Sequence, residues 1–136
     1  MSTWLIPCSS KVFRIHDYFM SNSIVDWKQS HYKFSVGDIV YIYCSHPEMS
    51  VRYKLIVVET GIEFNDSIKD EEYWADYHIS QSAAKQNKYV RMELIDRLNS
   101  TELDLSVLKD NGLKTAPQGP CRIGGNVLSY IESIFK

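Results

Sequence analysis

Several features that often reveal a protein's class are scarce in this chain of 136 residues. Its three cysteines, Cys8, Cys44 and Cys121, are odd in number and far apart, which argues against a disulfide framework and against a Cys-x-x-Cys zinc site. No apolar run approaches the roughly 20 residues that cross a bilayer, and no basic start followed by an apolar core resembles a leader. These absences predict reduced thiols and a cytoplasmic protein.

The numbers of positively and negatively charged residues are also nearly equal. The 15 basic and 17 acidic residues give a formal net charge of -2, so the field of the whole molecule does not attract nucleic acid without selection. Any contact with nucleic acid therefore requires a local patch. The length and the 44% hydrophobic content suit one domain with a real core, which we expect to span residues 1–136.

Motifs of common enzymes are incomplete. His46-Pro47-Glu48 has the His-x-Glu spacing of zinc deaminases, but no Pro-Cys-x-x-Cys follows, and Gly124-Gly125 lacks the Lys-Ser/Thr of a P-loop. The other histidines, His16, His31 and His78, belong to no recognisable motif. A cysteine nucleophile with a distant histidine is the alternative, but cysteines without an activating motif favour structural thiols. We expect no catalytic residue, metal or cofactor.

Apolar spacing predicts the main elements. Residues 3–6 are expected to form a strand that Pro7 ends, and a helix capped by Ser9 or Ser10 is expected to run to Met20. Its apolar face would hold Val12, Ile15 and Phe19. Residues 39–45 are apolar on both faces, which predicts a central strand, and residues 51–59 alternate as its hairpin partner.

The C-terminal half adds one strand and two helices. We expect a strand at residues 88–98, a helix from Asp104 to Asn111, and a last helix capped by Asn126 that buries Val127, Ile131, Ile134 and Phe135. Residues 116–120 are too rigid for a strand. The order predicts an α+β fold, in which a small mixed sheet curls into a pseudo-barrel closed by short helices.

The most informative stretch is Asp26-Trp27-Lys28-Gln29-Ser30, followed by Gly37-Asp38 and the apolar strand that ends on Ser45. At these residues the chain resembles the EVE domains of the PUA-like superfamily, which also contains the YTH and ASCH domains. The resemblance begins at Trp4-Leu5-Ile6 and covers nearly the whole chain. It also includes residues 52–58, Tyr73-Trp74 and Arg122-Ile123.

The resemblance implies a reader domain that accepts a modified nucleobase into an aromatic cage. It also implies a nuclease partner, because bacterial relatives are often fused to, or encoded near, nucleases that restrict modified DNA. Many EVE domains carry a Gly-Val-Arg-Asn-like run after the cage tryptophan, whereas Lys28-Gln29-Ser30 follows it here. The preferred base is therefore open between methylated or hydroxymethylated cytosine and N6-methyladenine.

A pocket for such a base needs aromatic planes for stacking and polar groups that check the base edge. The residues expected to form the cage are Trp27, Trp74, Tyr43, Ser45, Gln118 and Ser30. Each has a structural alternative: Trp27 and Trp74 as core aromatics, Tyr43 as a cross-strand packing residue, and Gln118 as part of a rigid turn.

The residues expected to contact phosphates are Lys28, Lys33, Arg52, Lys54, Lys88 and Arg122. The predicted function is a non-catalytic reader that prefers modified DNA, with any cleavage supplied by a separate nuclease domain or subunit. The alternatives are an RNA-binding PUA-like or ASCH-like domain, and a protein-interaction module that kept the fold and lost the ligand.

Overall fold

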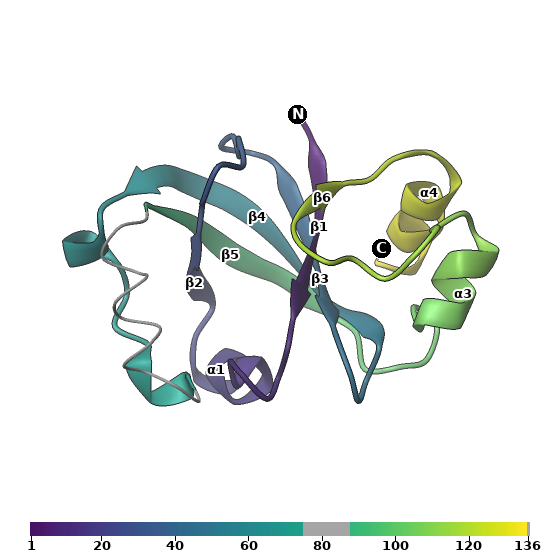
Figure 1. Cartoon of the computed structure of the whole chain (residues 1–136), viewed down its shortest axis with the longest axis horizontal. Helices are drawn as coiled ribbons and strands as arrows, with labels where there is room; N and C mark the ends of the chain where they lie inside the picture. The colour runs from purple at the N-terminus through teal and green to yellow at the C-terminus, as the bar shows by residue number, and fades with distance from the viewer. Residues whose placement is uncertain (75–87, 136) are drawn as a thin grey trace.

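The chain forms a six-stranded mixed sheet with the strand order β2-β5-β4-β3-β1-β6 (Figure 1). This computed structural model describes residues 1–74 and 88–135. The strands are β1 (Thr3–Cys8), β2 (Ile24–Lys28), β3 (Ile39–Cys44), β4 (Ser50–Ile62), β5 (Tyr89–Arg97) and β6 (Cys121–Arg122). The helices are α1 (Ile15–Ser21), α3 (Leu105–Asp110) and α4 (Gly125–Ile134), with short 3-10 turns η1 (Phe64–Asp66) and η2 (Glu71–Tyr73).

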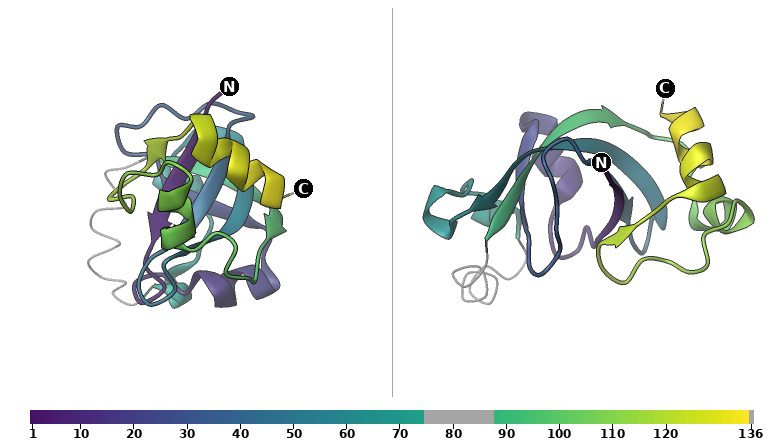
Figure 2. Two further views of the ribbon diagram at one scale, coloured as in Figure 1. Left: turned by 90° about the vertical axis from the view of Figure 1, so that its right-hand side faces the viewer. Right: turned by 90° about the horizontal axis from the view of Figure 1, so that it is seen from above.

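The sheet is strongly curved, and its two faces support two separate cores. Figure 2 shows the sheet as an arch, with α1 and the loop of residues 29–38 on its hollow side and α3 and α4 beyond one end. Strand β3 serves both cores, since Val40 and Ile42 pack on the hollow side whereas Tyr41 and Tyr43 pack toward α3 and α4. This alternation follows from the two-residue period of a strand.

The predicted α+β class, with a mixed sheet and short flanking helices, is confirmed. Strand β3 is central, as its two apolar faces predicted, because it pairs in parallel with β1 and antiparallel with β4. The predicted hairpin of β3 and β4 and the predicted strand β5 are also confirmed. Strand β4 is longer than predicted and extends to Ile62. The described strands leave two edges, β2 and β6, so the pseudo-barrel is an open arch.

Three local predictions were wrong, and strand β2 was missed. Pro7 does not end β1, because β6 pairs only with Trp4 and Leu5, so at Pro7 the strand has a neighbour on one side only. The first helix begins at Ile15 rather than near Ser10, so Val12 is exposed. Strand β2, which contains Trp27, was not predicted. The N-cap of α4 is Gly124 rather than Asn126.

Asp38 anchors the entry into β3. Its buried carboxylate accepts hydrogen bonds from the Trp4 indole Nε1 at 3.0 Å and from the backbone N–H groups of Ser2 at 2.9 Å and Ser35 at 3.0 Å. Gly37 precedes it with φ of +95°, a left-handed conformation that favours glycine. Burial alone would raise the pKa of Asp38, but these hydrogen bonds outweigh it and lower the pKa.

Among residues 1–74 and 88–135, no helix is both long enough and apolar enough to cross a membrane.

Candidate nucleic-acid interface

Trp27 and Trp74 are both half-buried and contact the same phenylalanine ring, that of Phe13, on the concave side of the sheet. Phe13 is 1% exposed, and its ring stacks on Trp74 with centroids 4.7 Å apart at 29°. The same ring meets Trp27 edge-on, with centroids 5.9 Å apart at 80°. A β-bridge between Phe13 and Trp74 holds the two backbones together. Both indoles are therefore positioned against a rigid, apolar base and keep part of their surface accessible.

An ion pair fixes the strand that carries Trp27. Asp26 is 4% exposed, and its two carboxylate oxygens accept from Arg91 Nε at 2.8 Å and Nη2 at 2.9 Å, across the β2–β5 pair. The second oxygen also accepts from the backbone N–H of Ile68 at 2.8 Å. The hydrogen bonds to Asp26 raise the pKa of Arg91 against the opposing effect of burial. Asp26 thus ties β2, β5 and the loop that leads to Trp74 into one unit.

Two basic residues lie at the adjacent ends of β2 and β5, close to Trp27 along the strand. Lys28 follows Trp27 at the end of β2 and pairs in register with Tyr89, while Lys88 precedes Tyr89 and accepts a backbone hydrogen bond from Gln29 at 2.9 Å. Lys88 Nζ lies 3.6 Å from a carboxylate oxygen of Glu63, and both side chains are largely exposed. An exposed pair is worth about 1 kcal/mol at most, so a phosphate can compete for Lys88. Ser30 begins the adjoining loop and is exposed.

A shallow groove continues from that loop to β6. Tyr32 meets the buried Trp4 edge-on, with centroids 6.1 Å apart, and the Arg122 guanidinium lies 5.0 Å from the centre of the same indole. The groove has a volume of about 520 Å³ and is lined by Tyr32 and residues 112–124. A Cβ on Gly119 would lie 3.1 Å from the Tyr32 hydroxyl, so glycine permits this close approach.

The six residues predicted for the cage occupy two places. Tyr43, Ser45 and Gln118 line a pocket of about 430 Å³ together with Pro7 and residues of the β3–β4 turn, and Gln118 also lines the groove beside Tyr32. Tyr43 is 2% exposed and packs in the core toward α3 and α4, and the Ser45 hydroxyl donates to the carbonyl of Cys8 at 3.3 Å. The structure therefore brings Trp27 and Trp74 together but does not place Tyr43, Ser45 and Gln118 beside them.

The six basic residues predicted for phosphate contact are also dispersed. Lys28 follows Trp27 in β2, Lys88 precedes β5, Lys33 is exposed on the same loop as Tyr32, and Arg122 lies over Trp4. Lys54 lies 6.0 Å from the centre of the Tyr41 ring, on the face that carries α3 and α4. Arg52 donates to the carbonyl of Ser100 at 3.0 Å and lines a pocket with His16.

A cluster of possible metal ligands borders that last pocket, which His16 and Glu48 line. Donor atoms of His16, Cys44 and Glu48 all lie within 4.8 Å of one another. The sequence did not predict this cluster, because the three residues lie on different elements and share no ligand spacing. His78, also considered from the sequence, lies outside the described residues.

Two aromatic residues of the candidate site were not predicted. Tyr32 could have been predicted from the sequence, because it is an aromatic residue in a polar loop with basic neighbours, five residues after Trp27. Phe13 could not have been predicted in this way, because its position in the site depends on contact with Trp74, which is 61 positions away in the sequence.

Comparison with protein-family profiles and with curated protein sequences finds no match. Solved structures do match. An ASCH mutant protein from Zymomonas mobilis has a TM-score of 0.68 and 13% identity, over 98% of this chain and 96% of that one. A hypothetical protein from Leishmania major has a TM-score of 0.67 and 20% identity, over 98% and 94%. Human THYN1, solved in complex with 5-methylcytosine-containing DNA, has a TM-score of 0.66 and 13% identity, over 98% and 97%. These likenesses show the PUA-like fold, as predicted, whereas membership of the EVE family stays a prediction.

Proposed function

We propose that this chain is a nucleic-acid-binding domain that reads a modified base in DNA, stacked against Trp27 and Trp74. The proposal is based mainly on the contact of both indoles with the buried ring of Phe13; Lys28 and Lys88 lie at the adjacent ends of β2 and β5. A flipped base needs an aromatic surface to replace the stacking that it loses in the duplex. The basic residues nearby can hold the phosphates on either side.

The likeness to THYN1 supports this proposal, because that protein uses the same fold and was solved with 5-methylcytosine-containing DNA. Methylated or hydroxymethylated cytosine is the first candidate base, and N6-methyladenine the second. The resemblance to EVE domains supports a further part of the proposal, in which the chain recognises modified DNA for a restriction nuclease. Cleavage would then come from a separate domain or subunit, so the chain alone should leave a modified duplex intact.

Trp27→Ala is expected to weaken binding to the preferred modified duplex by about 5- to 150-fold, because stacking of one base on an aromatic side chain contributes about 1–3 kcal/mol. The measurement is fluorescence anisotropy on matched duplexes that carry cytosine, 5-methylcytosine, 5-hydroxymethylcytosine, adenine or N6-methyladenine. Tyr130→Ala on α4 is the control, since it removes an aromatic ring far from the interface.

The result that supports the proposal is selective binding to one modified duplex that Trp27→Ala loses and Tyr130→Ala keeps. Equal binding to every duplex, or binding to none, would overturn it. Preference for single-stranded RNA that depends on the 2′-hydroxyls would favour the RNA-binding alternative instead. Circular dichroism of both variants verifies that the fold is intact.

The lysines beside Trp27 are expected to set the salt dependence of binding. Each phosphate contact contributes about 0.9 to the slope of log affinity against log salt, so Lys28→Gln and Lys88→Gln should each reduce the slope by about one. Lys109→Gln, on the exposed side of α3, should leave it unchanged. If all three variants keep the wild-type slope between two salt concentrations, these two lysines do not contact phosphate.

A further inference from the structure

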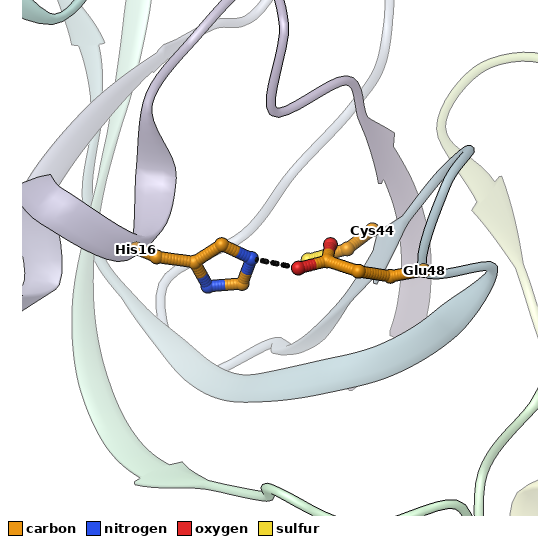
Figure 3. Close-up of side chains that lie close together, drawn as sticks. All are labelled: His16, Cys44 and Glu48. Atoms are coloured by element: carbon orange, nitrogen blue, oxygen red, sulfur yellow. Dashed lines mark hydrogen bonds and ion pairs between the residues drawn. The ribbon is translucent and has the colours of Figure 1, made fainter.

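A mixed cluster of nitrogen, sulfur and oxygen donors lies where α1 meets the β3–β4 hairpin. His16 comes from α1, Cys44 ends β3, and Glu48 lies in the turn before β4. Figure 3 shows the His16 imidazole facing the Glu48 carboxylate, with the Cys44 thiol close to the same carboxylate. One donor atom from each residue lies within 4.8 Å of the others. The cluster is distinct from the Trp27 interface, and the inference drawn from it is independent of the proposed function.

The contacts orient these groups toward one point. His16 Nε2 lies 2.5 Å from Glu48 Oε1, and His16 Nδ1 lies 2.5 Å from the Tyr53 hydroxyl. The second carboxylate oxygen, Oε2, is buried and accepts no hydrogen bond of normal geometry among the described residues, and the Cys44 thiol lies close to the same carboxylate. A buried acceptor without a normal hydrogen bond is unfavourable, so this oxygen is suited to a cation.

The donor set matches one class of metal ion. Imidazole nitrogen, thiolate sulfur and carboxylate oxygen are all ligands of Zn²⁺, and three protein ligands with a fourth open position form a common tetrahedral arrangement. The Tyr53 hydroxyl would hold the other ring nitrogen of His16, as second-shell groups do at many zinc sites. We propose that His16, Cys44 and Glu48 bind a divalent zinc-like cation.

Binding requires only a small rearrangement. Nitrogen and oxygen ligands of a tetrahedral zinc ion lie about 3.4 Å apart, so Glu48 would withdraw by about 1 Å from His16. Glu48 lies in a turn, and its side chain is 26% exposed, which leaves it room to move. The Cys44 S–H bond breaks as the sulfur–metal bond forms, and that proton passes to solvent. The proton between His16 Nε2 and Glu48 Oε1 is also displaced, and His16 takes the tautomer whose Nδ1–H donates to the Tyr53 hydroxyl.

The surrounding charges fit a bound cation with a solvent ligand. The cluster borders a pocket of about 360 Å³ that Arg52 and Arg97 also line. Thiolate and carboxylate together supply two negative charges, which neutralise the divalent ion. The two guanidiniums therefore face a neutral site, and the open position would take water or a small anion.

Cobalt titration of the whole chain tests the site, because a cobalt–thiolate bond gives a near-ultraviolet charge-transfer band. We expect one Co²⁺ per chain, visible bands of tetrahedral intensity, a charge-transfer band, and displacement by Zn²⁺. Cys44→Ser should lose the charge-transfer band. Cys8→Ser is the matched control, because Cys8 is a buried thiol opposite Cys44 on β1 but lies outside the cluster; it should keep the band.

His16→Gln and Glu48→Gln leave the buried thiols in place and should each weaken Co²⁺ binding at least tenfold, so they decide the outcome if Cys44→Ser does not fold. Zn²⁺ should also raise the melting temperature of the wild type but not of Glu48→Gln. Absence of stoichiometric binding would overturn the proposal. So would a charge-transfer band that persists in Cys44→Ser and disappears in Cys121→Ser.

Discussion

Arg91→Ala is expected to lower the free energy of unfolding by about 3–5 kcal/mol, because it leaves a buried carboxylate without its charged partner. Asp26 is 4% exposed, and the paired Arg91 supplies two of the hydrogen bonds that compensate for its burial. The remaining bond, from the Ile68 N–H, cannot replace a guanidinium charge. Urea denaturation followed by circular dichroism measures the effect.

Two further variants separate the ion pair from simple loss of side-chain packing. Arg91→Lys keeps the charge but not the two parallel hydrogen bonds, so its loss should be intermediate. Asp26→Asn combined with Arg91→Ala should be more stable than Arg91→Ala alone, because the buried charge is gone. If Arg91→Ala costs less than about 1 kcal/mol, Asp26 is not buried as the structure shows.

The same substitution has a consequence for function. Asp26 precedes Trp27 and also holds Ile68 in the segment that leads to Trp74. Loosening Asp26 should therefore weaken base-dependent binding even at temperatures where the Arg91→Ala chain remains folded.

Asp38→Asn is expected to lower the free energy of unfolding by about 3 kcal/mol, because an amide cannot accept from three donors as a carboxylate does. The affected donors are the indole of Trp4 and the N–H groups of Ser2 and Ser35. Thermal or urea unfolding measures the loss. Asp96→Asn, at an exposed position of β5, is the control and should change stability by less than about 0.5 kcal/mol.

The stabilisation by Asp38 should also depend on pH. Its pKa is lower in the folded chain than in the unfolded one, so the contribution is fully present above the unfolded pKa of about 3.9. It is lost as the pH falls through the folded pKa. The wild type should thus exceed Asp38→Asn in stability by a constant amount near neutrality and by progressively less in acid below about pH 4. A difference that stays constant in acid would contradict the charged role of Asp38.

Local patterns predicted the regular elements well where burial was uniform along an element. The apolar residues of β3 and β5 recur at the spacing that is typical of a strand, and this spacing can be read from neighbouring residues in the sequence. Strand β2 was missed because it is a short edge strand with the charged residues Asp26 and Lys28 around Trp27. Its pairing comes from β5, which lies more than 60 residues further along the chain.

The sequence alone determined the α+β class and the central hairpin, since these depend on periodicity and on residue type, whereas the role of Trp27 stays a prediction. Only the tertiary structure decided which residues act together. Alternate residues of β3 face different cores, so Tyr43 packs away from the core against which Trp27 and Trp74 lie. The packing of α1 and of the β3–β4 turn against the sheet brings His16, Cys44 and Glu48 together. Contacts of this kind depend on strand register and on the packing of helices against the sheet, which no local spacing records.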